Sequence, residues 1–345
     1  MSSVMVGMSG GVDSSVAAAL LQRQGHRVAG VTMRLWKETG DNTKEVEDAA
    51  QVCRSLGIPH FVLDLTEEFY QTVVQDFIMQ YRAGKTPNPC IVCNRTMKFG
   101  KMLSFALEQG YELISTGHYV ECRQENGRYR LLQSENLQKD QSYVLYHLTQ
   151  EQLSHCIFPL VSYSKDQIRQ MARDWELPVA QKPDSQDICF LPKDYAAFLE
   201  RQSGKMEPGN FIDWEGKVIG RHRGIYHYTI GQRKGLGGTF GKPMFVTKIT
   251  PADNTVTLGE TGEEYCTQLR AGNVNWIDDR VAGAEFQTDV MIRYKSKRYV
   301  GIVSPNEDGT VTVTFPEEPP RAVTPGQAAV FYQDRYVLGG GTILE

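Results

Sequence analysis

Apolar and polar positions follow a repeating order along the first two hundred residues. Short apolar runs such as Ser3–Gly7 precede longer stretches such as Val12–Gln24, in which apolar positions recur every three or four residues. This order predicts parallel strands joined by helices that cover both faces of a sheet. Thr66 is expected to cap one helix, with Glu67 and Glu68 in its first turn. The other strands are predicted at Arg27–Met33, Phe61–Leu65 and Leu113–Thr116, and the other helices at Lys44–Leu56, Thr66–Tyr81 and Arg95–Gln109.

The pattern changes near residue 203. Glycine becomes frequent, and apolar positions alternate with polar ones, which is typical of short antiparallel strands. Pro251–Asn254 lies between two such runs and predicts a hairpin. We therefore expect a doubly wound parallel α/β domain over residues 1–203, a small β-rich domain over 204–269 and a C-terminal β-barrel over 270–345. The strands expected after residue 203 are Val246–Ile249, Thr255–Leu258, Asp289–Tyr294, Tyr299–Ser304, Val311–Phe315 and Ala328–Tyr332.

Composition adds an expected compartment. The chain is 41% hydrophobic and 23% charged, and it has no apolar run of the length that spans a membrane. The start Met1–Val4 does not resemble an export signal. Seven irregularly spaced cysteines favour reduced thiols over a disulfide framework. We expect a cytoplasmic protein without a membrane segment.

Charge is unevenly distributed although the net charge is only −4. No acidic residue lies between Asp76 and Glu108, or between Glu215 and Asp253. Such basic stretches indicate a surface for a polyanion, unless they are a chance solvated face. Their cations are Arg82, Lys85, Arg95, Lys98 and Lys101 in the first stretch, and Lys217, Arg221, Arg223, Arg233, Lys234, Lys242 and Lys248 in the second.

A glycine- and serine-rich loop, Gly7–Ser15, follows the first predicted strand and opens the first helix. Its paired glycines allow backbone amides to approach phosphate oxygens, and the helix start adds positive potential. Asp13 is a candidate for holding Mg²⁺ or for capping the helix. The loop lacks the Lys-Ser/Thr ending of a Walker loop. It resembles the SGGxDS loop of the N-type ATP pyrophosphatases (PP-loop superfamily), which adenylate an acceptor; the alternative is an ordinary strand–helix turn.

Two cysteine segments lie far apart in the sequence. Cys90 and Cys93 stand in Thr86–Asn94, which is expected as a proline-bounded loop before the Arg95 helix. The helix start, Arg95 and Lys98 are expected to lower the pKa of Cys93. Cys189 follows in a polar segment, Asp184–Phe190. A single C-x-x-C without a second pair disfavours structural zinc, and Cys53 is interpreted as a packed core thiol.

Four motifs together resemble the tRNA-specific 2-thiouridylases over nearly the whole chain. They are SGGVDSS at 9–15, TPNPCIVCN at 86–94, DSQDICF at 184–190 and YTIGQRKGLG at 228–237. The resemblance implies 2-thiolation of the wobble uridine of tRNA. ATP, with Mg²⁺, adenylates the C2 oxygen, and a persulfide on Cys189 supplies the sulfur. Cys93 acts as the second thiol and ends in a transient disulfide with Cys189.

The resemblance also implies partners and site residues. The partners are the anticodon stem-loop of a tRNA and a sulfur donor such as a cysteine desulfurase or a sulfur relay protein. ATP is assigned to Gly7, Met8, Ser9, Gly10, Gly11, Val12, Asp13, Ser14 and Ser15, with Met33 and Gly117 beside the adenosine. The target base is assigned to Asn88, Pro89 and Cys90, and the tRNA to His118, Lys139, Asp140, Gln141, Arg233, Lys234, Arg293, Tyr294 and Gln327.

Several alternatives stay open from the sequence. Many family members have aspartate where this chain has Cys90, so a proton-handling role of that carboxylate does not transfer. Cys90, Cys93 and Cys189 could instead hold an iron–sulfur cluster, although the metal-free persulfide route is preferred. An adenylating ligase or amidotransferase for a small molecule would leave the paired cysteines and basic stretches unused. A nucleotide-sensing RNA-binding module would show no turnover.

Overall fold

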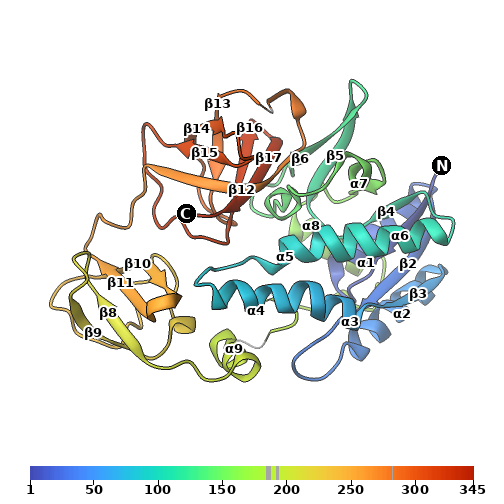
Figure 1. Cartoon of the computed structure of the whole chain (residues 1–345). Coiled ribbons are helices and arrows are strands. Elements are labelled where there is room, and N and C mark those ends of the chain that lie inside the picture. Colours follow the sequence, from blue (N-terminus) through green and yellow to red (C-terminus); the bar gives the residue numbers. More distant parts are fainter. Residues whose placement is uncertain (184–187, 192–193, 282) are drawn as a thin grey trace. The chain divides into compact units, whose positions relative to one another are not determined.

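A computed structural model describes residues 1–183, 188–191, 194–281 and 283–345 (Figure 1). The chain divides into two compact units. The first unit comprises Met1–Val73, Cys90–Pro192 and Arg335–Val337, and the second comprises Val74–Pro89, Lys193–Asp334 and Leu338–Glu345.

The bounds of the elements follow the predicted order of strands and helices. The strands are β1 (Ser3–Gly7), β2 (Arg27–Arg34), β3 (His60–Asp64), β4 (Leu113–Ser115), β5 (Val120–Glu125), β6 (Arg128–Gln133), β7 (Cys156–Ile157), β8 (Gly209–Ile212), β9 (Val218–His222), β10 (Phe245–Thr250), β11 (Thr255–Gly259), β12 (Gln268–Trp276), β13 (Phe286–Met291), β14 (Tyr299–Pro305), β15 (Val311–Thr314), β16 (Ala328–Gln333) and β17 (Tyr336–Ile343). The helices are α1 (Val12–Arg23), α2 (Thr43–Leu56), α3 (Thr66–Phe69), α4 (Gln75–Arg82), α5 (Pro89–Cys93), α6 (Met102–Glu108), α7 (Gln150–Ser154), α8 (Lys165–Asp174) and α9 (Tyr195–Ser203).

The first unit is built on a parallel sheet in the order β3-β2-β1-β4-β7. Strand order reverses after β3, because β4 pairs on the other side of β1. Right-handed crossovers therefore place α1 and α2 on one face and α6 on the other. Val4, Leu21 and Val52 belong to the core between β1, α1 and α2. The predicted doubly wound parallel sheet is confirmed.

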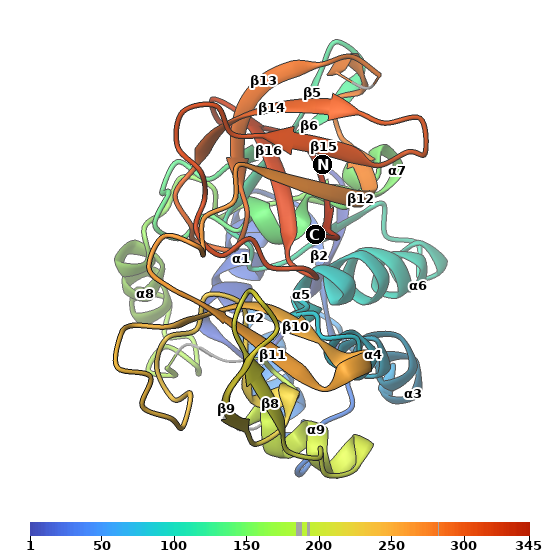
Figure 2. The same ribbon diagram turned by 60° about the vertical axis from the view of Figure 1, so that its left-hand side comes forward.

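The second unit contains two antiparallel structures. Strands β10, β11, β8 and β9 form a small sheet, in which β8 pairs parallel with β11 and the other two described pairs are antiparallel. Strands β12, β15, β14, β13, β16 and β17 close into a barrel through the pairing of β12 with β17 (Figures 1 and 2). Its interior is filled by apolar side chains such as Val290, Val313 and Phe331. The predicted hairpin and closed barrel are confirmed.

Several predicted boundaries were wrong for local reasons. Leu65, not Thr66, occupies the N-cap position, and the carboxylate of Asp64 instead accepts bonds from the Thr66 amide and hydroxyl, at 3.0 and 2.7 Å. The helix expected from Arg95 already begins at Pro89, because proline suits a first helical position. Tyr70–Val74 and Asn94–Lys101 are π-helical segments, which a 3.6-residue periodicity does not reveal.

The hairpin β5–β6 was missed, although its turn carries a recognisable signal. Asn126 and Gly127 have φ of 50° and 79°, the left-handed values that an Asn-Gly turn adopts. Strand β13 ends at Met291, three residues before the predicted Tyr294. Among the described residues, no helix is long and apolar enough to cross a membrane.

One close contact in the sheet yields a stability prediction. A Cβ on Gly30 in β2 would lie 2.5 Å from Cys53 Sγ and 2.9 Å from Met8 Cγ. We expect Gly30→Ala to reduce the free energy of unfolding by about 1–3 kcal/mol through overpacking. In a Cys53→Ala background the same substitution is expected to cost less, because the sulfur is gone. Urea unfolding, monitored through hydrogen exchange of the β1 and β2 peptides, measures the loss of unfolding free energy in both backgrounds. Equal losses would contradict the proposed clash with Cys53.

Candidate active site

The loop Gly7–Ser15 lies where β1 ends and α1 begins, as the sequence predicted. Gly10 has φ of +67°, and a Cβ there would lie 2.7 Å from the carbonyl oxygen of Glu45. Gly11, which has no side chain, occupies the N-cap position of α1. The loop is held in shape by its own serines, because the Ser9 amide donates to Ser14 Oγ at 3.2 Å. The start of α1 can therefore be approached closely by an anion.

Two further predicted residues lie at the same carboxyl edge of the sheet. Met33 is the penultimate residue of β2, and its carbonyl oxygen accepts a bond of 2.9 Å from Asn42. Gly117 follows β4, and a Cβ there would lie 2.8 Å from the Ser14 amide nitrogen. Glycine at 117 thus lets this segment pack directly against the start of α1. Ligands of open α/β sheets bind at such an edge.

Asp13 is held by two side chains that the sequence analysis did not single out. Its Oδ1 accepts bonds from Lys165 Nζ and from the hydroxyl of Tyr119, both at 2.7 Å. Tyr119 is positioned by Gln141, since the Tyr119 amide donates to Gln141 Oε1 at 3.0 Å and the Gln141 amide donates back at the same distance. The carboxylate thus joins the loop to the start of α8 and to the segment before β5.

Asp140 and Gln141 serve the fold in this structure. Asp140 is buried and accepts bonds from the Ser134 amide at 2.9 Å, the Ser142 hydroxyl at 2.7 Å and Gln133 Nε2 at 3.1 Å. Burial raises the pKa of Asp140, and these bonds oppose the rise. Direct RNA contact by the Asp140 carboxylate is therefore disfavoured, whereas the neighbouring Lys139 is only partly buried.

The three candidate thiols belong to one neighbourhood of the first unit. Cys90 and Cys93 lie on α5, at the beginning of the continuous helical stretch that leads into α6. Cys90 and Cys189 are exposed, and Cys93 is 7% exposed. The segment of Cys189 is anchored by Phe190, whose ring lies 5.4 Å from that of Phe69. The motif residues 184–187 lie outside the described residues.

The prediction of a lowered pKa for Cys93 was wrong. Its pKa is raised to about 12, chiefly by burial; Lys98 lowers it, and Cys189 and Cys90 raise it. Burial also raises the pKa of Cys90 and of Cys189, although part of each side chain reaches solvent. Lys98 acts in the expected direction, but the loss of hydration outweighs it.

Lys98 is the cation shared by this neighbourhood. It lowers the pKa of Cys90, Cys93 and Cys189, against the larger effect of burial. Its place follows from the π-helical segment, in which a residue five positions after Cys93 returns to the same side of the helix. Gln152 supports this segment by donating to the carbonyl oxygens of Arg95 and Phe99 at 3.2 and 2.8 Å.

His118 is buried, contrary to what an RNA contact requires. Its Nδ1 shares a bond of 2.7 Å with the Thr116 hydroxyl, and its ring centroid lies 6.1 Å from that of Phe99. Burial lowers the pKa of His118 well below its ordinary value, and Lys98 lowers it further. A direct contact between this side chain and RNA is disfavoured in this conformation.

In the second unit, Gln327 anchors the beginning of the Thr86–Asn94 motif. Its Nε2 donates to the carbonyl oxygen of Thr86 at 2.6 Å, and the Thr86 amide donates to Pro325 at 2.8 Å. Gly326 has φ of +91°, and a Cβ there would lie 3.0 Å from the Thr86 nitrogen. The position of Asn88, two residues further on, therefore depends on the loop before β16.

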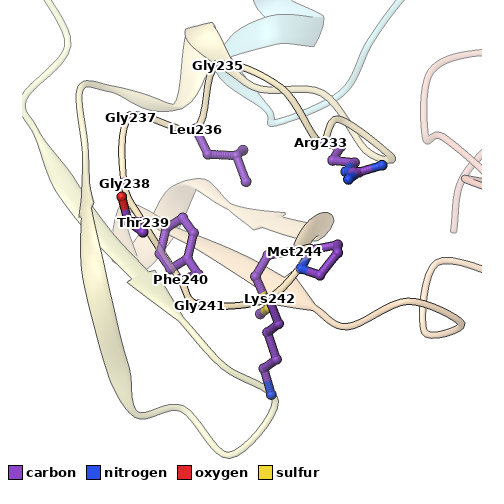
Figure 3. A pocket seen from close by; sticks show the side chains of 11 residues that line it. Arg233, Gly235, Leu236, Gly237, Gly238, Thr239, Phe240, Gly241, Lys242 and Met244 are labelled. Carbon is purple, nitrogen blue, oxygen red and sulfur yellow. The ribbon is translucent and has the colours of Figure 1, made fainter.

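The second basic stretch is exposed. All seven cations of this stretch, Arg233 and Lys234 among them, are exposed. The glycine-rich segment Arg233–Met244 curves around a hollow of about 800 Å³, with Leu236 and Phe240 turned toward its interior (Figure 3). These cations are Lys217, Arg221, Arg223, Arg233, Lys234, Lys242 and Lys248.

The barrel carries the other predicted RNA contacts. Arg293 and Tyr294 are exposed just after β13, and Arg293 Nη2 donates to the carbonyl oxygen of Arg321 at 2.9 Å. Arg321 in turn stacks 4.7 Å from the ring centroid of Phe245, and Arg233 lies 6.0 Å from the same ring. Three arginines of the second unit are thus linked through one backbone carbonyl and one aromatic ring.

In the part of the chain that the structure describes, no three His, Cys, Asp or Glu side chains are arranged so that they could hold a metal ion. Mg²⁺ prefers carboxylate, hydroxyl and phosphate oxygens, and Asp13 with Ser9 and Ser14 offers such donors beside the phosphate loop.

Sequence reasoning missed Lys165 and Tyr119 because neither belongs to a recognised motif. One signal was present: Ser164 and Gln167 form a capping box, which fixes the start of a helix at Lys165. A cation at a helix start is electrostatically unfavourable. A lysine at that position is therefore a residue whose placement calls for an explanation outside its own helix.

Three family models match the chain in succession. Residues 2–193 match the tRNA methyl transferase HUP domain, residues 196–260 the tRNA methyl transferase PRC-barrel domain, and residues 266–343 the aminomethyltransferase beta-barrel domain. These descriptions mention methyl transfer, whereas the full-length relatives are named for thiolation.

The chain is 47% identical to the tRNA-specific 2-thiouridylase MnmA of Acetivibrio thermocellus, over 99% of this chain and 98% of that protein. It is 43% identical to the protein of the same name from Clostridium perfringens, over 99% and 98% of the two chains. A solved 4-thiouridine synthetase–RNA complex with bound ATP is 20% identical, with a TM-score of 0.36 over 58% of this chain and 50% of that one, which is too distant to carry an argument. Because the relatives match from end to end, the chain belongs to the family of tRNA-specific 2-thiouridylases.

Proposed function

We propose that the protein is an ATP-dependent sulfurtransferase that replaces the C2 oxygen of a tRNA wobble uridine with sulfur. The observation that carries the proposal is that one unit contains both a phosphate-type loop and three cysteines whose side chains act on one another's pKa values. Family membership supports the same activity. We also propose that the chain has three domains, with boundaries at about residues 203 and 269.

ATP is the proposed source of activation. The C2 oxygen of uridine is amide-like and a poor leaving group, so it attacks the α-phosphorus of ATP and pyrophosphate leaves. The loop Gly7–Ser15 binds the phosphates, with Mg²⁺, and Met33 and Gly117 lie beside the adenosine. Their shared location at the carboxyl edge of the sheet supports this assignment.

The proposed sulfur transfer proceeds through Cys189 and Cys93. A partner protein places a persulfide on Cys189, and its terminal sulfur attacks C2 while AMP leaves. The thiolate of Cys93 then attacks Cys189 Sγ, which breaks the bond to the transferred sulfur and leaves 2-thiouridine with a Cys93–Cys189 disulfide. A thiol reductant restores both cysteines. Cys90, with Asn88 and Pro89, is proposed to face the target base.

The tRNA is proposed to lie on the exposed cations of the second unit. Arg233, Lys234 and Arg293 are exposed, and their charges suit phosphates. Tyr294 is exposed beside Lys295 and offers a ring for stacking. Gln327 acts through Thr86 and is a positioning residue, so it orders the segment that leads to the target-base residues.

The proposed function is tested by three cysteine variants. With tRNA, ATP, Mg²⁺ and a persulfide donor, we expect the wild type and Cys90→Ser to make 2-thiouridine, while Cys93→Ser and Cys189→Ser do not. Mass spectrometry of digested tRNA measures the product. Cys122→Ser is the matched control, because this thiol is also partly buried but lies outside the thiol neighbourhood.

Two outcomes would change the proposal. Pyrophosphate release without thiolation by the wild type would favour an adenylating ligase, and binding of tRNA without turnover would favour a binding module. Stoichiometric iron in anaerobically purified protein, together with an inactive Cys90→Ser variant, would replace the persulfide route with a cluster.

The raised pKa values make thiol reactivity strongly dependent on pH. With its pKa at about 12, only about one Cys93 in ten thousand is a thiolate at pH 8. We expect its alkylation by iodoacetamide to accelerate about tenfold per pH unit from pH 7 to 9.5, because the thiolate is the reacting form. In urea the rate should level off near pH 9. Peptide-level mass spectrometry measures both series, and levelling-off in the folded protein at the same pH would contradict the burial effect.

The basic surface yields a prediction on salt dependence. Replacing Arg233 and Lys234 with alanine should weaken tRNA binding and lower the slope of log affinity against log salt by up to about two. The affinity for ATP should not change. Filter binding at several salt concentrations measures the slope, with Lys205→Ala, outside the acid-free stretch, as the control. An unchanged slope would show that these cations face solvent without contacting RNA.

A further inference from the structure

The phosphate loop contains no cation. Gly7–Ser15 has neither lysine nor arginine, whereas Walker loops supply a lysine to the terminal phosphates. Leaving pyrophosphate carries several negative charges, and the start of α1 offers only a partial positive charge. A cation from elsewhere in the fold would therefore stabilise the phosphates that the loop itself cannot neutralise.

Lys165 brings such a cation to the loop. Its Nζ lies 2.7 Å from Asp13 Oδ1, and only 12% of the lysine side chain and 32% of the aspartate side chain are exposed. The lysine is the first residue of α8, whose start is fixed by the Ser164 capping box. Ile168 of α8 packs in the same core as Val16 of α1. The backbone of Lys165 is thus held in place beside the loop.

The placement of Lys165 is unfavourable for α8 itself. A cation at a helix start opposes the helix dipole, which destabilises the helix. The partial burial of its ammonium group adds a desolvation cost. Both costs are offset in the ligand-free protein by the contact with Asp13. The arrangement therefore points to a use of the charge at the start of α1.

We propose that Lys165 binds the β- and γ-phosphates of ATP and the pyrophosphate that leaves. This inference rests on the proposed function, because it requires the loop to bind ATP. Asp13 is the resting partner of the lysine. With a magnesium–polyphosphate complex bound, the Asp13 carboxylate would hold Mg²⁺ and Lys165 would hold a phosphate oxygen. Two ion pairs exchange partners, so no charge is left unpaired.

The exchange explains the part of Tyr119. Its hydroxyl donates to the same Oδ1 atom as the lysine, at 2.7 Å, and it keeps the carboxylate oriented when the lysine moves to phosphate. The carboxylate is thus already positioned before the metal arrives. Tyr119 is a positioning residue in this scheme.

The test is direct binding of two probes to the full chain by titration calorimetry. Magnesium pyrophosphate reports on the proposed lysine contact, while AMP lacks the phosphates that the lysine would hold. We expect Lys165→Met to weaken pyrophosphate binding by at least about tenfold and AMP binding by less than about twofold, and Lys165→Arg to retain most of the pyrophosphate affinity. Arg173→Gln, an exposed change on the same helix, is the matched control and should bind both probes normally.

Contrary results separate this inference from the proposed function. Normal pyrophosphate binding by Lys165→Met, or an equal loss of AMP binding, would overturn the lysine assignment while the thiolation assay stands. A wild type that releases no pyrophosphate from ATP in the presence of tRNA would overturn the proposed function itself. If Lys165→Met does not fold, acetylation of wild-type lysines provides the answer: pyrophosphate should protect Lys165 and AMP should not, and equal protection would refute the contact.

Discussion

The carboxylate of Asp13 is the point on which the first unit's site depends. It stands in the first turn of α1, and its Oδ1 receives bonds from α8 through Lys165 and from the segment before β5 through Tyr119. Tyr119 is in turn fixed by Gln141, and the neighbouring Asp140 orders the loop that carries it. Segments 106 and 152 residues away in the sequence are thereby brought to one helix start. Gly117, after β4, makes this possible, because it leaves no side chain between its own segment and Ser14.

The thiols obey a different constraint. A reactive thiol needs deprotonation, yet burial raises the pKa of each of the three candidate cysteines. Protonated thiols are poor nucleophiles and are oxidised slowly. Burial therefore protects the sulfur groups while no substrate is bound, and Lys98 is the nearby charge that opposes the rise. With the pKa of each thiol raised, the proposed sulfur transfer is suppressed in this state.

Much of this architecture was readable in the sequence. The alternation of short apolar runs with helical patterns predicted the strands and helices of the first unit. The short alternating strands of the glycine-rich second half predicted the closed barrel. Both signals are local, because hydrophobic periodicity reflects which positions of an element are buried. The loop Gly7–Ser15 and the cysteine motifs were equally local signals. What could not be read were long-range partners: Lys165, Tyr119 and Gln327 act on residues that lie 152, 106 and 241 positions away. The pKa of Cys93 was misjudged for the same reason. The sequence shows which charged residues lie near Cys93 along the chain, but it does not show how deeply the thiol is buried.

The π-helical segment Asn94–Lys101 has a consequence for how the helix is phased. Each residue of an α-helix turns the chain by about 100°, so the extra residue in a wide turn rotates everything before it relative to everything after it. Met102 and Ala106 are buried in α6, while Cys93, before the segment, lies close enough to Cys90 and Cys189 for them to act on its pKa. The π-helical segment thus changes the angle, about the helix axis, between the thiol-bearing start of the helix and the buried residues of α6.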